Sequence, residues 1–247
     1  MKTILITGAS SGFGLETAKY FLAKGWKVIA TMRNPADNSL PESGQLSILP
    51  LDVTNMESIK SLVYSVDYID VLVNNAGVGM LAALEGTSDE VIQTLFTTNT
   101  LGYINMVKAF LPQFRQQKSG VIINVSSAVT LKALPLLSVY TASKAAINAF
   151  TESLAIELEP FNIRMNLVIP GQAPATRFGA NAKARMENAF PEPYLDLANK
   201  MFLNRPKQAK VTRSQDVAEA IWQAATDDKS PMWIVAGEDA KAMVLSD

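Results

Sequence analysis

Residues 4–14 of the chain are ILITGASSGFG, an apolar run followed by glycines with the spacing G-x-x-x-G-x-G. The residues from Ile4 to Thr7 predict a short buried strand, and those from Leu15 to Lys24 predict a helix that ends at Gly25. A glycine turn between a strand and a helix lets the backbone approach a pyrophosphate, and the first N–H groups of the helix favour phosphate. The turn therefore predicts a dinucleotide site, with binding residues Gly8, Ser10, Ser11, Gly12, Phe13 and Gly14.

The composition indicates a globular domain, with 247 residues of which 48% are hydrophobic and 18% charged. The absence of Cys and His excludes disulfides and histidine triads and argues against zinc, so no metal is expected. The net charge of 22 − 23 = −1 gives no support for a nucleic-acid surface. No apolar stretch approaches the ~18 residues of a membrane span, and the N-terminal apolar run meets glycine too early for a signal peptide. We therefore expect a cytoplasmic protein without a membrane span.

Strands and helices alternate along the whole chain. Further strands are predicted at residues 27–32, 46–51, 70–73, 121–125, 163–169 and 232–235. This alternation indicates α/β architecture, a single doubly wound domain over residues 1–247 whose parallel sheet has helices on both faces. Ligands of such sheets bind at the carboxyl ends of the strands, where we expect these residues to converge: Gly8, Asp52, Asn75, Ser127 and Gly171.

Two helix features follow from local patterns. Thr54 is expected to cap a helix that starts near Asn55, with Glu57 completing a capping box. A long helix is predicted to start at residues 87–90 and to contain Asn99. Because Asn is poor inside helices, Asn99 is either a satisfied polar core residue or a point where the helix is interrupted to hold something.

The end of the second strand bears on the choice of dinucleotide. An acid there binds the ribose of NAD, whereas an Arg accommodates the 2′-phosphate of NADP. The strand ends at Met32 without an acid, and Arg33 follows Gly14 by 33 − 14 = 19 residues. We therefore favour NADP(H), with NAD(H) as the alternative if Arg33 is only a solvated loop residue.

Small or polar residues follow the next two strands, namely Asp52, Val53, Asn74, Asn75, Ala76 and Gly77. Asp52 either holds its turn or accepts a hydrogen bond from an adenine amino group. The run from Asn74 to Gly77 suits a crevice where a ligand meets backbone, although a plain turn has the same composition.

Tyr140 and Lys144 are four residues apart and share a face if they lie on one helix. An ammonium beside a phenol lowers the phenol's pKa from about 10, which makes tyrosine a usable acid or base near neutral pH. The strand at residues 121–125 leads into Ser126 and Ser127, whose hydroxyls could meet the Tyr. The spacing alone is common by chance, usually as an amphipathic helix edge.

In order along the chain, these motifs resemble the short-chain dehydrogenase/reductase family, and the resemblance covers essentially all of the sequence. It implies a seven-stranded Rossmann-type sheet in the order 3-2-1-4-5-6-7 and a homodimer or homotetramer. It also selects Ser127 over Ser126, at 140 − 127 = 13 residues before Tyr140. The segments at residues 216–220 and 235–240 resemble hydroxysteroid and retinol dehydrogenases.

The resemblance implies hydride transfer between a nicotinamide and a carbonyl carbon. Tyr140 would exchange the proton, and Ser127 would hydrogen-bond the substrate oxygen. Lys144 would lower the Tyr140 pKa and bind the ribose, while Asn99 would hold a water that relays protons. Tyr140 and Lys144 thus also belong to the implied cofactor site.

Two departures from the family pattern concern the same site. The resemblance implies cofactor contacts at Pro170 and Gly171 and at a Thr four residues later, but Ala175 stands there and Thr176 follows. Thr130 stands where a glycine is common.

Residues 172–210 are expected to form a partly helical lid over the substrate, carrying Phe178, Phe190, Tyr194, Leu197, Met201 and Phe202. An apolar pocket is predicted from Val78, Met80, Val129, Leu131, Leu134 and Leu136, although many of these can be core residues. The expected substrate is a hydrophobic ketone, aldehyde, steroid or other secondary alcohol. The alternatives are an NAD-dependent alcohol dehydrogenase and a catalytically idle NADP-binding regulator, against which the complete Asn-Ser-Tyr-Lys set argues.

Overall fold

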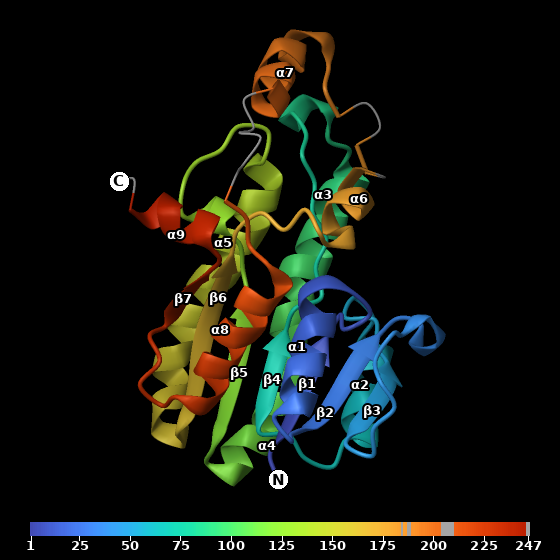
Figure 1. Ribbon diagram of the computed structural model, residues 1–247, viewed down its shortest axis with the longest axis vertical. Coiled ribbons are helices and arrows are strands. Elements are labelled where there is room, and N and C mark those ends of the chain that lie inside the picture. Colours follow the sequence, from blue (N-terminus) through green and yellow to red (C-terminus); the bar gives the residue numbers. More distant parts are fainter. Residues whose placement is uncertain (184, 187–188, 204–209, 246–247) are drawn as a thin grey trace.

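The computed structural model describes residues 1–183, 185–186, 189–203 and 210–245 (Figure 1). They form a parallel seven-stranded sheet in the order β3-β2-β1-β4-β5-β6-β7, which confirms the predicted topology. The strands are β1 Thr3–Thr7, β2 Lys27–Met32, β3 Leu46–Pro50, β4 Val71–Asn74, β5 Gly120–Val125, β6 Ile163–Pro170 and β7 Trp233–Ala236. The α-helices are α1 Gly12–Ala23, α2 Met56–Ser65, α3 Asp89–Phe96, α4 Gly102–Gln117, α5 Ser138–Leu158, α6 Arg177–Lys183, α7 Leu195–Leu203, α8 Ser214–Thr226 and α9 Glu238–Val244.

Helices cover both faces of the sheet because its strands are apolar on both sides. Ile4 and Ile6 pack with Phe21 of α1 and Ile221 of α8 on one face. Leu5, between them, packs on the other face against residues of α2, α4 and α5, including Ile59, Phe110 and Leu158. Side chains alternate along a strand, so one short run supplies both layers of the core.

The turn before α2 corrects one prediction. Asn55 caps this helix, since its Oδ1 accepts hydrogen bonds from the N–H groups of Glu57 at 2.9 Å and Ser58 at 3.1 Å. Thr54 instead donates its hydroxyl and its N–H to Asp52 Oδ1, at 2.7 and 2.9 Å. The prediction of Thr54 as the cap was wrong by one residue, and Asp52 holds the turn.

The long helix predicted around Asn99 consists of α3, a π-helical segment at Thr97–Leu101, and α4. Asn99 is fully buried in the π-helical turn, a type of turn frequent at functional sites. Its Oδ1 accepts from Val78 N at 2.8 Å, and its Nδ2 donates to Val78 O at 2.8 Å and to Ser143 Oγ at 3.1 Å. Both alternatives for Asn99 therefore hold: the residue interrupts the helix and is satisfied.

The segment predicted as a lid leaves the sheet after β6 and returns at α8. It contains α6, α7 and a 3-10 turn at Glu192–Tyr194, and α7 lies at the end of the molecule farthest from the chain's N-terminus (Figure 1). Residues 184, 187–188 and 204–209 of this segment, and the side chain of Phe202, lie outside the described part. No helix in the described ranges is long and apolar enough to cross a bilayer.

Candidate active site

A cavity of about 880 Å³ opens at the carboxyl edge of the sheet, between the strand ends and the lid segment. The sequence-predicted residues that line it are Gly8, Ser10, Ser11, Gly12, Phe13, Arg33, Asp52, Val53, Asn75, Ala76, Gly77, Ser127, Tyr140, Lys144, Pro170, Gly171 and Thr176. Gly14 and Asn99 were also predicted as site residues, but they do not line the cavity. One cavity thus gathers residues from almost the whole length of the chain.

The turn after β1 has the geometry that a phosphate requires. Gly8 and Gly12 have φ angles of +69° and +56°, which favour glycine. Gly14 packs so tightly that an added Cβ would lie 2.6 Å from Asn75 Nδ2. Ser11 precedes α1 without a side-chain cap, and the first turn of α1 carries no acid. The N–H groups at the start of α1 are therefore not occupied by a capping side chain.

Thr7 fastens this turn to the end of β4. Its Oγ1 accepts hydrogen bonds from Asn75 N at 2.9 Å and Ala76 N at 3.0 Å. Asn75 in turn donates from Nδ2 to Thr7 O at 2.9 Å and to Gly8 O at 3.2 Å. The Asn75 side chain is therefore a brace between two strand ends.

Tyr140, in the first turn of α5, lies near Ser127, which follows β5, and the Ser127 hydroxyl is close enough to act on the pKa of the phenol. The neighbouring Ser126 also lines the cavity, while its own hydroxyl is buried and has no hydrogen-bond partner among the described residues. Ser127 and Tyr140 therefore place two hydroxyl-bearing side chains at this point of the cavity.

Lys144 lies one helical turn beyond Tyr140 and is buried. Its Nζ donates to Val125 O at 3.0 Å, contacts Tyr103 Oη at 3.4 Å and lies 5.0 Å from the centre of the Tyr103 ring. Gly77 separates Lys144 from Asn99, since an added Cβ there would lie 3.2 Å from Asn99 Oδ1 and 3.5 Å from Lys144 Nζ. Tyr103 was not predicted, because nothing in its local sequence distinguishes it from a core aromatic residue.

The pKa values of this pair differ from the prediction. Burial raises the pKa of Tyr140 to about 12, against the opposing effect of the Ser127 hydroxyl. Burial also lowers the pKa of Lys144 to about 7. The predicted lowering of the Tyr140 pKa by Lys144 is therefore wrong in this structure. The physical reason is desolvation, which disfavours the charged form of both groups.

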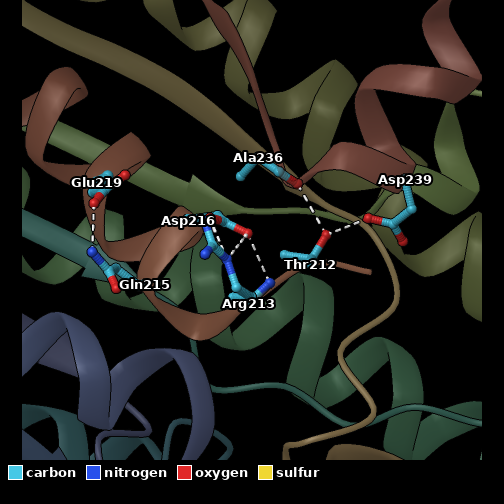
Figure 2. Close-up of polar contacts among 7 residues, drawn as sticks. All are labelled: Thr212, Arg213, Gln215, Asp216, Glu219, Ala236 and Asp239. Atoms are coloured by element: carbon cyan, nitrogen blue, oxygen red, sulfur yellow. Dashed lines mark hydrogen bonds and ion pairs between the residues drawn. The ribbon is translucent and has the colours of Figure 1, made fainter. Parts of the chain in front are cut away.

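Pro170 and Gly171 are held by two residues that the sequence did not suggest. Gly171 N donates to Thr212 Oγ1 at 2.8 Å, and that hydroxyl also lies 2.7 Å from Asp239 Oδ1 and 3.1 Å from Ala236 O (Figure 2). Thr212 N donates to Gln172 O at 2.8 Å, and Gln172 N donates to Asp239 Oδ2. Both ends of the lid segment are therefore joined at one buried threonine. The local sequence feature at this junction is Gly237. Its φ of +94° favours glycine, and a Cβ there would collide with Thr212.

Phe178, from α6, covers part of the cavity. Its ring lies 6.0 Å from the Tyr140 ring, centre to centre, and occupies the space beside Gly79 where a side chain would otherwise point. Thr176 lies against Gly12, and its hydroxyl donates to Ala173 O at 2.8 Å. The lid segment thus contacts both the tyrosine and the glycine turn.

The predicted apolar pocket is only partly correct. Val78, Met80, Val129, Leu134, Phe178 and Met201 line the cavity. Leu131 and Leu136 do not; they pack into core clusters, as do Phe190 and Tyr194. An apolar residue in a loop has no periodicity that shows which way it faces, which explains these errors.

Comparison with known proteins agrees with this geometry. The family model described as short chain dehydrogenase matches residues 2–187. A 3-ketodihydrosphingosine reductase of Bacteroides thetaiotaomicron is 42% identical, over 68% of this chain and 62% of that protein, so the chain spans less than two thirds of that relative. Human retinol dehydrogenase 8 is 35% identical, over 94% of this chain and 80% of that protein.

Solved structures with bound cofactor are also similar. The closed form of a serine dehydrogenase complexed with NADP+ has a TM-score of 0.80 and 28% identity, covering 96% of this chain and 94% of that one. A short chain dehydrogenase from Burkholderia cenocepacia in complex with NADP has a TM-score of 0.79 and 26% identity, covering 100% and 94%.

Proposed function

Since this chain belongs to the short chain dehydrogenase family, we propose that it is an NADP(H)-dependent oxidoreductase that interconverts a hydrophobic ketone or aldehyde and its alcohol. The observation that carries the proposal is the pairing of the Ser127 and Tyr140 hydroxyls in a cavity that also contains the glycine turn. The uncapped start of α1 fits a dinucleotide ligand. A bound nicotinamide would supply or accept the hydride.

Tyr140 is the proposed proton donor. With a pKa of about 12 the phenol is protonated at neutral pH, so it suits the acid role in carbonyl reduction. Ser127, whose hydroxyl lies near the phenol, would hydrogen-bond the substrate oxygen and stabilise the charge that develops on it. Tyr140 lies on α5, and Ser127 lies between β5 and a 3-10 turn at Ala128–Thr130, so both hydroxyls are positioned by regular elements or their ends.

Lys144 and Asn99 act behind Tyr140. A pKa of about 7 leaves Lys144 partly protonated at neutral pH, so it can help to restore the proton that Tyr140 gives up. Asn99 uses its amide hydrogens within the protein, on Val78 O and on the hydroxyl of Ser143, the residue before Lys144. A water that relays protons here would have to donate to Asn99 Oδ1 or to a backbone carbonyl.

NADP(H) is favoured over NAD(H) by Arg33, which follows β2 and lines the cavity, at a strand end whose sequence contains no acid. An arginine at this strand end accommodates a 2′-phosphate. Similar solved structures hold NADP, NADH or NAD, so the choice of NADP(H) rests on Arg33. An NAD-dependent alcohol dehydrogenase remains the alternative within the family.

The proposed substrate is hydrophobic because the cavity beyond Tyr140 is lined by Val78, Met80, Val129, Leu134 and Phe178. The reductase and retinol dehydrogenase relatives have names that indicate lipid-like substrates, which supports this class. We also propose a homodimer or homotetramer, because members of this family are commonly oligomeric, and light scattering would measure the assembly.

The experiment is a cofactor-oxidation assay across hydrophobic ketones and aldehydes, run with NADPH and with NADH. We expect turnover with at least one carbonyl class and a higher kcat/KM with NADPH. Tight NADPH binding without turnover on any substrate would favour the idle regulator instead. Faster alcohol oxidation with NAD+ than any reduction with NADPH would favour the alternative enzyme.

A further inference from the structure

Two arginines from distant parts of the chain face the same cavity. Arg33 follows β2 at the carboxyl edge of the sheet, and Arg185 lies just beyond the end of α6 in the lid segment. In the sheet order, β2 neighbours β1 on the side opposite to β4 and β5. Arg33 therefore lies at the end of the cavity away from Ser127 and Tyr140, and Arg185 is near enough for the two charges to interact.

Neither guanidinium forms an ion pair with a carboxylate in the part of the chain that the structure describes. The two charges also act on each other: burial, and next the charge of Arg33, lower the pKa of Arg185. Asp52 and Glu90 also line the cavity, but among the described residues neither forms an ion pair with Arg33 or Arg185. Two like charges that face one cavity without an ion-pair partner favour the binding of an anion between them.

Arg185 is held against the end of α6. Its Nη1 donates to Asn181 O at 2.7 Å. An arginine has five N–H donors, so most of the guanidinium remains available to a ligand. Planar, forked donors of this kind bind phosphate oxygens in pairs.

We propose that Arg185 joins Arg33 in binding the 2′-phosphate of NADP(H), so that the lid segment takes part in selecting the cofactor. This inference rests on the proposed dinucleotide function and extends it to a residue outside the strand ends. A phosphomonoester carries about −1.5 to −2 charges at neutral pH, which two guanidinium groups neutralise. NAD(H) lacks this group and would leave the two arginines facing each other.

A structural role for Arg185 as a cap of α6 is the competing explanation, and the chain offers a matched control. Arg177 is the first residue of α6 and is exposed, but it does not line the cavity. Arg177→Ala therefore removes the same kind of side chain from the same lid segment without touching the proposed site.

The test measures binding by calorimetry, without catalysis. The wild type, Arg185→Ala, Arg33→Ala and Arg177→Ala are titrated with adenosine 2′,5′-bisphosphate, 5′-AMP, NADPH and NADH. Arg185→Ala should weaken the bisphosphate and NADPH about tenfold and change 5′-AMP and NADH by less than about twofold. Arg185→Lys should fall between, and higher salt should shrink the difference. Arg177→Ala should match the wild type.

Three results would overturn the inference. If Arg185→Ala binds all four ligands like the wild type while Arg33→Ala loses NADPH, the lid takes no part and the proposed function stands. If Arg185→Ala weakens NADPH and NADH equally, its role is structural. If the wild type binds NADPH and NADH equally, the 2′-phosphate site and the cofactor preference both fail, while turnover of carbonyl substrates with NADH would still support the oxidoreductase.

Discussion

The two sides of the cavity are built differently. The strand-edge floor, defined here as Thr7, Asn75, Ser127, Tyr140 and Lys144, is held by hydrogen bonds between residues far apart in sequence, such as Asn75 to Thr7. In the lid segment, residues 172–210, the polar contacts beside the cavity are mostly local, such as Arg185 to Asn181. The lid segment contacts the floor through the Phe178 ring beside Tyr140 and brings the Arg185 charge near Arg33.

This difference suggests that the floor and the lid segment have separate roles. The floor has fixed geometry, as proton transfer requires, whereas the lid segment supplies surfaces that can change without moving the floor. Substitutions in the floor should therefore lower kcat, and substitutions in the lid should change KM or cofactor choice.

The largest expected effect is that of Tyr140→Phe. Loss of the phenol hydroxyl removes the proton donor, so kcat should fall about a thousandfold or more while NADPH affinity stays within about twofold. Steady-state kinetics and calorimetry measure the two quantities. Turnover near the wild-type rate would remove Tyr140 from the mechanism and end the proposed contrast between floor and lid.

Lys144→Met tests whether burial lowers the pKa of Lys144, through the pH dependence of the free energy of unfolding. The folded pKa of Lys144 is about 7 and the unfolded value is 10.5, so the unfolded chain binds more protons between these pH values. Wild-type stability should therefore rise relative to Lys144→Met as pH increases from 7 to 10, by about 3 kcal/mol. Urea denaturation at several pH values measures this difference. A difference that is flat with pH would mean that Lys144 keeps its ordinary pKa.

Thr212→Val tests where the lid joins the floor. The change leaves Gly171 N without its acceptor and should lower the free energy of unfolding by about 2 kcal/mol. Thr212→Ser should restore most of the loss. The matched control is Thr226→Val, whose exposed hydroxyl bonds only within α8. If both valine variants were equally stable, the junction would contribute nothing.

Phe178→Ala has the smallest expected effect. Its ring contacts Tyr140 but makes no bond needed for proton transfer, so KM for a hydrophobic ketone should rise about fivefold with kcat within about twofold. Phe161→Ala, a partly exposed ring in the turn after α5, serves as the control. A loss of kcat as large as that of Tyr140→Phe would show that Phe178 contributes to proton transfer, and it would contradict the separate roles of floor and lid segment.

The same contrast explains what the sequence could predict. Each residue of the strand-edge floor lies in a local motif at a strand or helix end, and a parallel sheet brings these ends to one edge. Thr212, Asp239 and Arg185 depend on contacts between distant segments, which no local pattern records. Leu131 and Leu136 were assigned to the pocket but are core residues.

Two local predictions also failed for physical reasons. Thr54 and Asn55 are both good helix caps, so the sequence placed the start of α2 one residue early. The direction of the Tyr140 pKa shift depends on burial, which is set by how α5, β5 and the lid pack together.

A crystal structure with bound NADP+ tests the central claim most directly, that Tyr140 exchanges a proton where a nicotinamide exchanges a hydride. We predict the nicotinamide ring beside the Tyr140 and Ser127 hydroxyls, with the pyrophosphate at the start of α1. A nicotinamide far from the Tyr140 hydroxyl, with no closed form that brings the two together, would contradict the account.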